Sequence, residues 1–169
     1  FGSTGQGSST HLVGELLALR TGMKLQHIPY KGGGQAVTDV AAGQIPMIVT
    51  VVPTVMPHIT QGRIVPIAVS GSKRAQSLPE VQTFTEAGVK DYDVSSWYGL
   101  LAPAKTPKPI IDKLQREIAE VMKMPEVRER YLKSSFEPVA NSPEEFAAQL
   151  KADYERWGQV VKDAKVKIE

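Results

Sequence analysis

Three strand-like segments alternate with short helical stretches in the first half of the chain, and this alternation restricts the fold more than any other feature. Residues 45–52 and 64–69 are almost continuously apolar, which is typical of strands buried on both faces of a parallel sheet. Residues 23–30 alternate apolar and polar side chains, as a strand does. The sequence therefore predicts an α/β unit with a parallel sheet.

The second half of the chain changes to a helical pattern. Apolar residues recur there at helical spacing, and no strand-like segment follows the aromatic stretch that begins near residue 94. We therefore expect two parts, an α/β lobe over residues 1–93 and a crossover with a mostly helical C-terminal part over residues 94–169. Helices are expected over residues 107–122, 125–134 and 143–161.

Local signals place several helix ends. Thr106 is expected to cap a helix with Pro107 at its first position. Ser142 and Glu145 have the spacing of a capping box, in which each side chain bonds the other's backbone N–H. Glycines are expected to end three earlier helices, at Gly22, Gly43 and Gly62.

The opening loop is the first candidate site. Its ten residues contain three glycines and five hydroxyl side chains, and they lead directly into an apolar helical segment. Ser8, Ser9 or Thr10 can cap that helix, and the glycines allow close backbone approach. Free N–H groups at the positive end of a helix bind phosphate or carboxylate. The alternative is an ordinary strand-to-helix turn with a serine cap.

A second glycine-rich loop, Tyr30 to Gly34, follows the strand-like segment 23–30. Ligands of parallel sheets gather outside the carboxyl ends of the strands. The opening loop, this second loop and Thr50 at the end of the next strand are therefore expected on one side, where their donors favour a small polar anion. The alternative for Gly32 to Gly34 is a flexible turn.

Nucleotide binding is not supported by the opening loop. Gly2 and Gly7 have the spacing of a P-loop, but Ser8 and Ser9 stand where Lys and Ser or Thr are required. The third glycine of a dinucleotide fingerprint is also missing.

Other function classes lack their residues. The chain has no cysteine, and its three histidines, His11, His27 and His58, are scattered without metal-ligand spacing. No G-x-S-x-G elbow or other catalytic set assembles. The net charge of +2, with both signs interspersed, is not the footprint of a nucleic-acid partner. We expect no cofactor, no metal and no enzyme activity.

Six longer stretches, taken in order along the chain, are more specific than any single motif. They are FGSTGQGSSTHLVGELL, IPYKGGGQAVTDVAAGQIPMI, MPHITQGRIVPIAVS, SLPEVQTFTEAG, SSWYGLLAPAKTP and SPEEFAAQLKADYERWGQVVK. Together they strongly resemble the substrate-binding proteins of tripartite tricarboxylate transporters, also called Bug-type periplasmic receptors.

The resemblance implies a two-lobed periplasmic binding protein of the type II arrangement, which closes on a di- or tricarboxylate or a related carboxylic acid and delivers it to membrane permease subunits. It implies that two loops, one per lobe, hold the ligand's carboxylates, and that the loop Ser3–Thr10 is the one from the second lobe. It further implies that this chain is the C-terminal portion, with the opposing loop in an absent N-terminal half. The expected ligand-binding residues are Ser3, Thr4, Gly5, Gly7, Ser8, Ser9, Thr10, Tyr30, Gly32 and Thr50.

Two alternatives stay open at this point. An acyl- or phosphoryl-handling enzyme could use the same loop, with His11 as the base beside Ser8 or Ser9. The chain could also form a dimer by exchanging elements with a second copy, which would bury the apolar stripes of the helical part.

Overall fold

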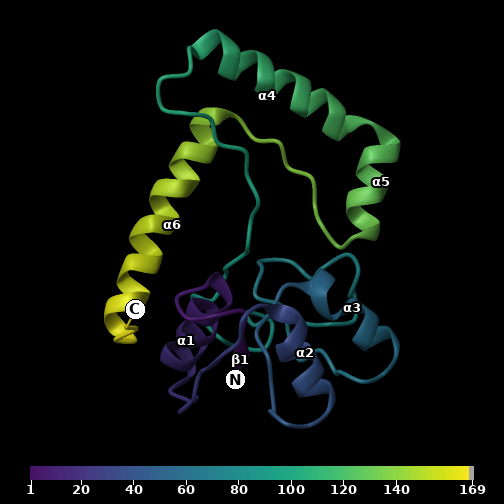
Figure 1. The fold of residues 1–169 in the computed structure, drawn as a ribbon, viewed down its shortest axis with the longest axis vertical. Helices are drawn as coiled ribbons and strands as arrows, with labels where there is room; N and C mark the ends of the chain where they lie inside the picture. The colour runs from purple at the N-terminus through teal and green to yellow at the C-terminus, as the bar shows by residue number, and fades with distance from the viewer. Residues whose placement is uncertain (168–169) are drawn as a thin grey trace. The chain divides into compact units, whose positions relative to one another are not determined.

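The computed structural model describes residues 1–167, which form a two-stranded parallel sheet and six α-helices (Figure 1). The chain divides into two compact units. The first comprises Phe1–Ser96 together with the residues from Trp157 onward, and the second comprises Trp97–Arg156. The elements are β1 (Gly2–Ser3), α1 (Ser9–Thr21), β2 (Ile28–Pro29), α2 (Gly33–Ala41), α3 (Val52–Thr60), α4 (Lys108–Lys123), α5 (Pro125–Lys133) and α6 (Pro143–Asp163).

Strand β1 lies at the centre of the first unit. It pairs in parallel with β2, with Gly2 opposite Ile28. On its other edge, the Gly2 N–H donates to the Met47 carbonyl at 3.0 Å, and the Gly2 carbonyl accepts from the Val49 N–H at 3.0 Å. Helices α1 and α2 both pack against β1 (Figure 1). The first residues of the chain are therefore held from several directions, which positions the loop that follows them.

Two of the predicted strands are much shorter than expected. In residues 23–30 only Ile28–Pro29 pairs, and in residues 45–52 only Ile48 forms a bridge, to Gly2. Val52 already belongs to α3, because Pro53 suits the first turn of a helix. The apolar run 45–52 predicted a strand buried on both faces, but only Ile45 is buried and most of the segment is half-buried, so both the burial and the length of backbone pairing were overstated.

The predicted strand 64–69 is wrong except at its end. Val69 forms a parallel bridge to Thr83, whereas the Val65 and Ile67 side chains are 81% and 69% exposed. A strand forms only where a neighbour offers paired backbone groups, and within residues 1–167 no strand flanks this segment.

The core of the first unit forms under α1. Tyr92 is 1% exposed, and its hydroxyl donates to the Val13 carbonyl at 2.7 Å. Burial raises the pKa of this phenol. Each apolar side chain buried in this way contributes about 1.5–3 kcal/mol. These contacts fix which face of α1 packs against the core, and they therefore also orient the N-terminal end of the helix. The core residues are Leu16, Leu17, Tyr92, Val94 and Val160.

The helical ends were predicted with mixed success. The capping box is confirmed, because the Ser142 N–H donates to Glu145 Oε2 at 2.8 Å and the Glu145 N–H donates to Ser142 Oγ at 3.2 Å. Hydrogen bonding from the Ser142 backbone N–H, and then from its side chain, lowers the pKa of the Glu145 carboxyl. The predicted Thr106 cap is wrong. Pro107 adopts an extended ψ of 137°, so the helix begins one residue later and Thr106 is out of reach.

The second unit buries little of its apolar surface. Helices α4 and α5 pack against each other but contain no buried residue. Trp97 meets Phe146 edge to face at 5.0 Å, and its Nε1 donates to Asp153 Oδ2 at 2.7 Å. Among residues 1–167, none of the helices combines the length and the apolar character that crossing a bilayer requires.

Candidate ligand-binding site

The turn from β1 into α1 depends on two glycines. Gly5 and Gly7 have φ values of +147° and +69°, which side chains with a Cβ rarely adopt. Ser8 follows in an extended conformation as the N-cap, and its Oγ accepts the His11 N–H at 3.3 Å. Ser8 is therefore the capping residue among the three candidates that the sequence offered.

A hydroxyl network ties the loop to the helix. Thr10 Oγ1 accepts the Thr4 N–H at 3.0 Å and lies 2.8 Å from Thr4 Oγ1 and 3.0 Å from Ser8 Oγ. Ser8 Oγ also donates to the Gly5 carbonyl at 2.7 Å. Thr10 is 5% exposed, so these bonds form away from bulk water. The loop is thus held in one shape by its own side chains.

The backbone N–H groups of the loop divide into two sets. Those of Thr4, Gly5 and Gly7 donate within the first unit, to Thr10 Oγ1, Ser3 Oγ and His11 Nδ1 respectively. The N–H groups of Ser9 and Thr10 have no acceptor among the described residues. They are the first two donors of α1, at the positive end of its dipole. These two groups therefore have unused hydrogen-bonding capacity within the described part of the chain.

Ser3 is fully buried, and its hydroxyl is occupied. Ser3 Oγ accepts the Gly5 N–H at 3.2 Å and lies 2.6 Å from His27 Nε2. The His27 ring stacks on the His11 ring with a centroid separation of 3.6 Å. Burial is the largest cause that lowers the pKa of His27 to about 4, and the neighbouring His11 ring adds to it.

This histidine pair was missed by reasoning from the sequence, which treated the histidines as scattered. His11 lies in the first turn of α1 and His27 directly precedes β2. The parallel pairing of β1 with β2 brings them together. His27 lies inside the predicted strand 23–30 and His11 lies in the helical segment before it, and no local pattern in the sequence links the two.

The second predicted loop lies beside the first. The Gly32 N–H donates to the Thr4 carbonyl at 3.1 Å, and the Tyr30 N–H donates to the Ser3 carbonyl at 3.3 Å. The Tyr30 hydroxyl donates to Asp39 Oδ2 at 2.8 Å, which raises the pKa of the phenol. That hydroxyl is therefore already committed as a donor.

Thr50 joins the same cluster. A Cβ added at Gly33 would lie 3.6 Å from Thr50 Oγ1 and 3.6 Å from Thr4 Cγ2. Thr50 Oγ1 is buried and has no hydrogen-bond partner in the described part of the chain. The structure thus brings together all three segments that the sequence placed on one side of the sheet.

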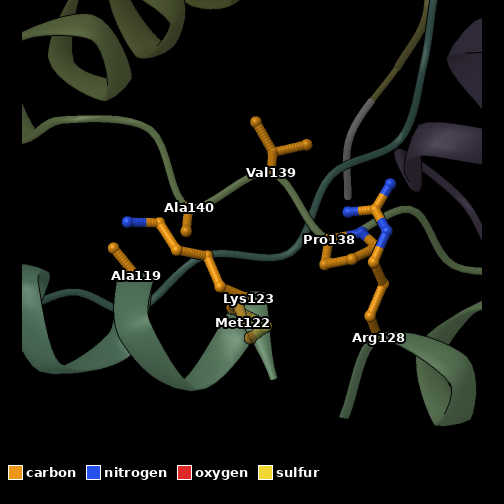
Figure 2. Close-up of a pocket in the computed structure, with 7 residues that line it drawn as sticks. All are labelled: Ala119, Met122, Lys123, Arg128, Pro138, Val139 and Ala140. Atoms are coloured by element: carbon orange, nitrogen blue, oxygen red, sulfur yellow. The ribbon is translucent and has the colours of Figure 1, made fainter. Parts of the chain in front are cut away.

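A cavity in the second unit contains none of the predicted residues. Its volume is about 290 Å³, and Figure 2 shows α4 side chains such as Met122 across from the extended segment that carries Val139. Lys123 at its edge pairs with Glu120 at 2.7 Å. The cavity is lined by five apolar residues and two cations, and none of them carries an unpartnered buried side-chain polar atom; the lining residues are Ala119, Met122, Lys123, Arg128, Pro138, Val139 and Ala140.

Comparison with known proteins identifies the class. The chain matches the Tripartite tricarboxylate transporter family receptor group, TctC, over residues 1–166. It belongs to this family, whose members are solute-binding receptors and not enzymes. The fold class predicted from the sequence, an α/β periplasmic binding protein of type II, is confirmed by the structural neighbours.

Three similar proteins illustrate the match. BugT of Bordetella pertussis is 33% identical over 162 residues, which cover 96% of this chain and 50% of BugT. A protein of R. palustris solved with adipate has a TM-score of 0.87 and 31% identity, covering 98% of this chain and 56% of that one. MatC from Rhodopseudomonas palustris, solved with bound malate, has a TM-score of 0.80 and 25% identity, covering 95% of this chain and 56% of that one. The chain thus spans about half the length of these proteins.

Proposed function

We propose that this chain forms one side of the ligand site of a periplasmic receptor, which captures a di- or tricarboxylate, or a related carboxylic acid, for the membrane subunits of a tripartite tricarboxylate-type transporter. The observation that carries the proposal is the pair of free N–H groups at Ser9 and Thr10, held at the start of α1 by a closed network of hydroxyl bonds. Family membership supports the receptor role, and the neighbours solved with adipate and malate support a carboxylate ligand.

The predicted site residues take different roles in this proposal. Ser3, Thr4 and Ser8 hold the loop in shape, while Gly5 and Gly7 allow its turns. The Ser9 and Thr10 N–H groups, with the exposed Ser9 hydroxyl, bind one carboxylate. The remaining members of the set line the site beside them, namely Tyr30, Gly32 and Thr50.

The test removes one N–H without disturbing the helix. Ser9 is the first residue of α1, where proline is favoured because that N–H has no intrahelical partner. Ser8 is already extended, as the residue before a proline has to be. Ser9→Pro therefore removes the N–H and the hydroxyl, whereas the matched control Ser9→Ala removes only the hydroxyl.

The measurement is calorimetry of the full-length protein with adipate, malate and citrate, and with adipamide as the uncharged analogue. We expect adipamide not to bind, and Ser9→Pro to weaken carboxylate binding about tenfold or more relative to Ser9→Ala, as the loss of a charge-assisted hydrogen bond predicts. Unfolding stability is expected to be equal in the two variants. Unchanged affinity in Ser9→Pro would show that the carboxylate lies elsewhere.

A further inference from the structure

The two stacked histidines contact the loop at two separate points. His11 Nδ1 accepts the Gly7 N–H at 3.0 Å, and His27 Nε2 lies 2.6 Å from Ser3 Oγ. The rings are nearly parallel, at 10°, and the ring of Phe1 lies 5.1 Å from that of His27. His11 is 3% exposed. Neither histidine belongs to the predicted ligand set, yet the pair holds two members of that set, Ser3 and Gly7, in the part of the loop that leads to Ser8.

Hydrogen-bond chemistry assigns the state of His11. The Gly7 N–H is a donor, so Nδ1 of His11 has to be its unprotonated nitrogen and the ring proton sits on Nε2. Nε2 lies 3.4 Å from Glu15 Oε1, which is within ion-pair distance of the carboxylate. A doubly protonated ring would set two N–H donors against each other at Gly7. The contact therefore requires a neutral His11.

The charged groups around the pair are few. Glu15 faces His11 from the same helix, and the backbone nitrogen of Phe1 donates to the Gln26 carbonyl at 2.6 Å beside His27. A positive charge on either ring would sit beside the other ring. Two neutral rings therefore suit this stack better than two charged ones.

We propose that His11 and His27 are positioning residues of the carboxylate site. Resting on the proposed function, the inference is that the neutral pair fixes Gly7 and Ser3, so that the loop presents the Ser9 and Thr10 N–H groups in one geometry before the ligand arrives. Such preorganisation improves affinity because the loop loses less conformational freedom on binding.

Matched variants separate the hydrogen bonds from the ring packing. His11→Asn places an amide oxygen near the position of Nδ1 and keeps an acceptor for Gly7, whereas His11→Phe keeps a ring and loses the acceptor. For His27 the corresponding pair is His27→Gln, which reaches the position of Nε2, and His27→Phe. All are made in the full-length protein, and thermal unfolding is recorded for each.

The first readout is affinity for adipate by calorimetry. Both Phe variants are expected to bind about tenfold more weakly, because a loop donor or hydroxyl loses its partner. The Asn and Gln variants are expected to stay within about threefold of the native protein. Equal affinities of His11→Asn and His11→Phe for adipate would overturn the inference, since ring packing alone would then explain the pair.

The second readout needs no ligand. Nitrogen chemical shifts of His11 are expected to show the Nε2-protonated tautomer, and the Gly7 amide is expected to exchange with solvent faster in His11→Phe but not in His11→Asn. If the native protein fails to bind adipate, malate and citrate, the proposed function is wrong, while this readout still decides the positioning role. If the Gly7 amide exchanges with solvent at the same rate in His11→Phe as in the native protein, the positioning role of His11 is refuted, whichever ligand the protein binds.

Discussion

The candidate site contains two buried threonine hydroxyls, of which one is hydrogen-bonded and the other has no partner in the described part of the chain. Substituting each threonine with valine tests this difference. Thr10 Oγ1 accepts the Thr4 N–H and contacts two further hydroxyls, whereas Thr50 Oγ1 has no partner among residues 1–167. Replacing either threonine with valine exchanges the hydroxyl for a methyl group of similar size. The two variants therefore differ mainly in the hydrogen bonds that they remove.

The expected magnitudes follow from this difference. Thr10→Val leaves the Thr4 N–H without its acceptor, which costs about 1–3 kcal/mol of stability. It also removes two contacts between hydroxyl groups, whose loss costs less than that of the N–H bond. We expect the free energy of unfolding to fall by about 2–3 kcal/mol. Thr50→Val removes no bond, and we expect a change between zero and a gain of about 1 kcal/mol, because an unpaired buried hydroxyl is itself unfavourable.

Urea unfolding measures both effects. With a slope of about 2 kcal/mol per molar urea, the midpoint of Thr10→Val is expected about 1 M lower and that of Thr50→Val unchanged or higher. Thr10→Ser keeps the hydroxyl and serves as the control. Equal midpoints for the two valine variants would refute the hydrogen-bond assignment. If Thr50 also binds the ligand, Thr50→Val weakens carboxylate binding while its midpoint stays high.

Two further perturbations test the packing and the protonation of the first unit. Gly14→Ala is expected to lower the free energy of unfolding by about 1–3 kcal/mol, because its Cβ would overlap the buried ring of Phe1. Gly158→Ala on α6 meets open space and is expected to raise the free energy of unfolding by about 0.5–1 kcal/mol. Thermal unfolding that shifts in the same direction for both would contradict this packing. The pKa of His27 is about 4 in the folded state against about 6.5 when unfolded, so between these pH values the unfolded state binds the extra proton and stability falls as the pH is lowered. Discounted for partial exposure, the loss is about 1–2 kcal/mol, and urea unfolding at pH 7 and pH 4.5 is expected to show a smaller loss in His27→Phe than in the native protein.

The parts of the fold that the sequence predicts well are those decided within one helical turn. The Ser8 cap, the Gly22 end of α1 and the Ser142–Glu145 box each depend on atoms three or four residues apart. Such contacts form wherever the helix forms, so residue type and spacing are sufficient to identify them. Even here a single dihedral matters, since the extended ψ of Pro107 displaced the expected Thr106 cap.

The strands were harder to predict because pairing depends on distant segments. Residues 64–69 have the apolar composition of a buried strand, but whether they pair is decided by the segments beside them, and only Val69 finds a partner. The same limit applies to His11 and His27. Nothing within four residues of either histidine indicates the other, and their stacking follows only once β1 and β2 are paired in register.

The distribution of hydrogen bonds changes how the opening loop can bind an anion. Composition alone suggests that every glycine N–H and every hydroxyl of the loop is a potential ligand donor. The structure shows that the N–H groups of Gly5 and Gly7 are already bonded, to Ser3 and His11. At the start of α1 the N–H groups of Ser9 and Thr10 are left without acceptors among the described residues, as is the N–H of the exposed Gln6 earlier in the loop. The glycines and most of the hydroxyls are therefore needed to build the loop, and the binding capacity is concentrated at the helix end, where the dipole also favours a negative charge.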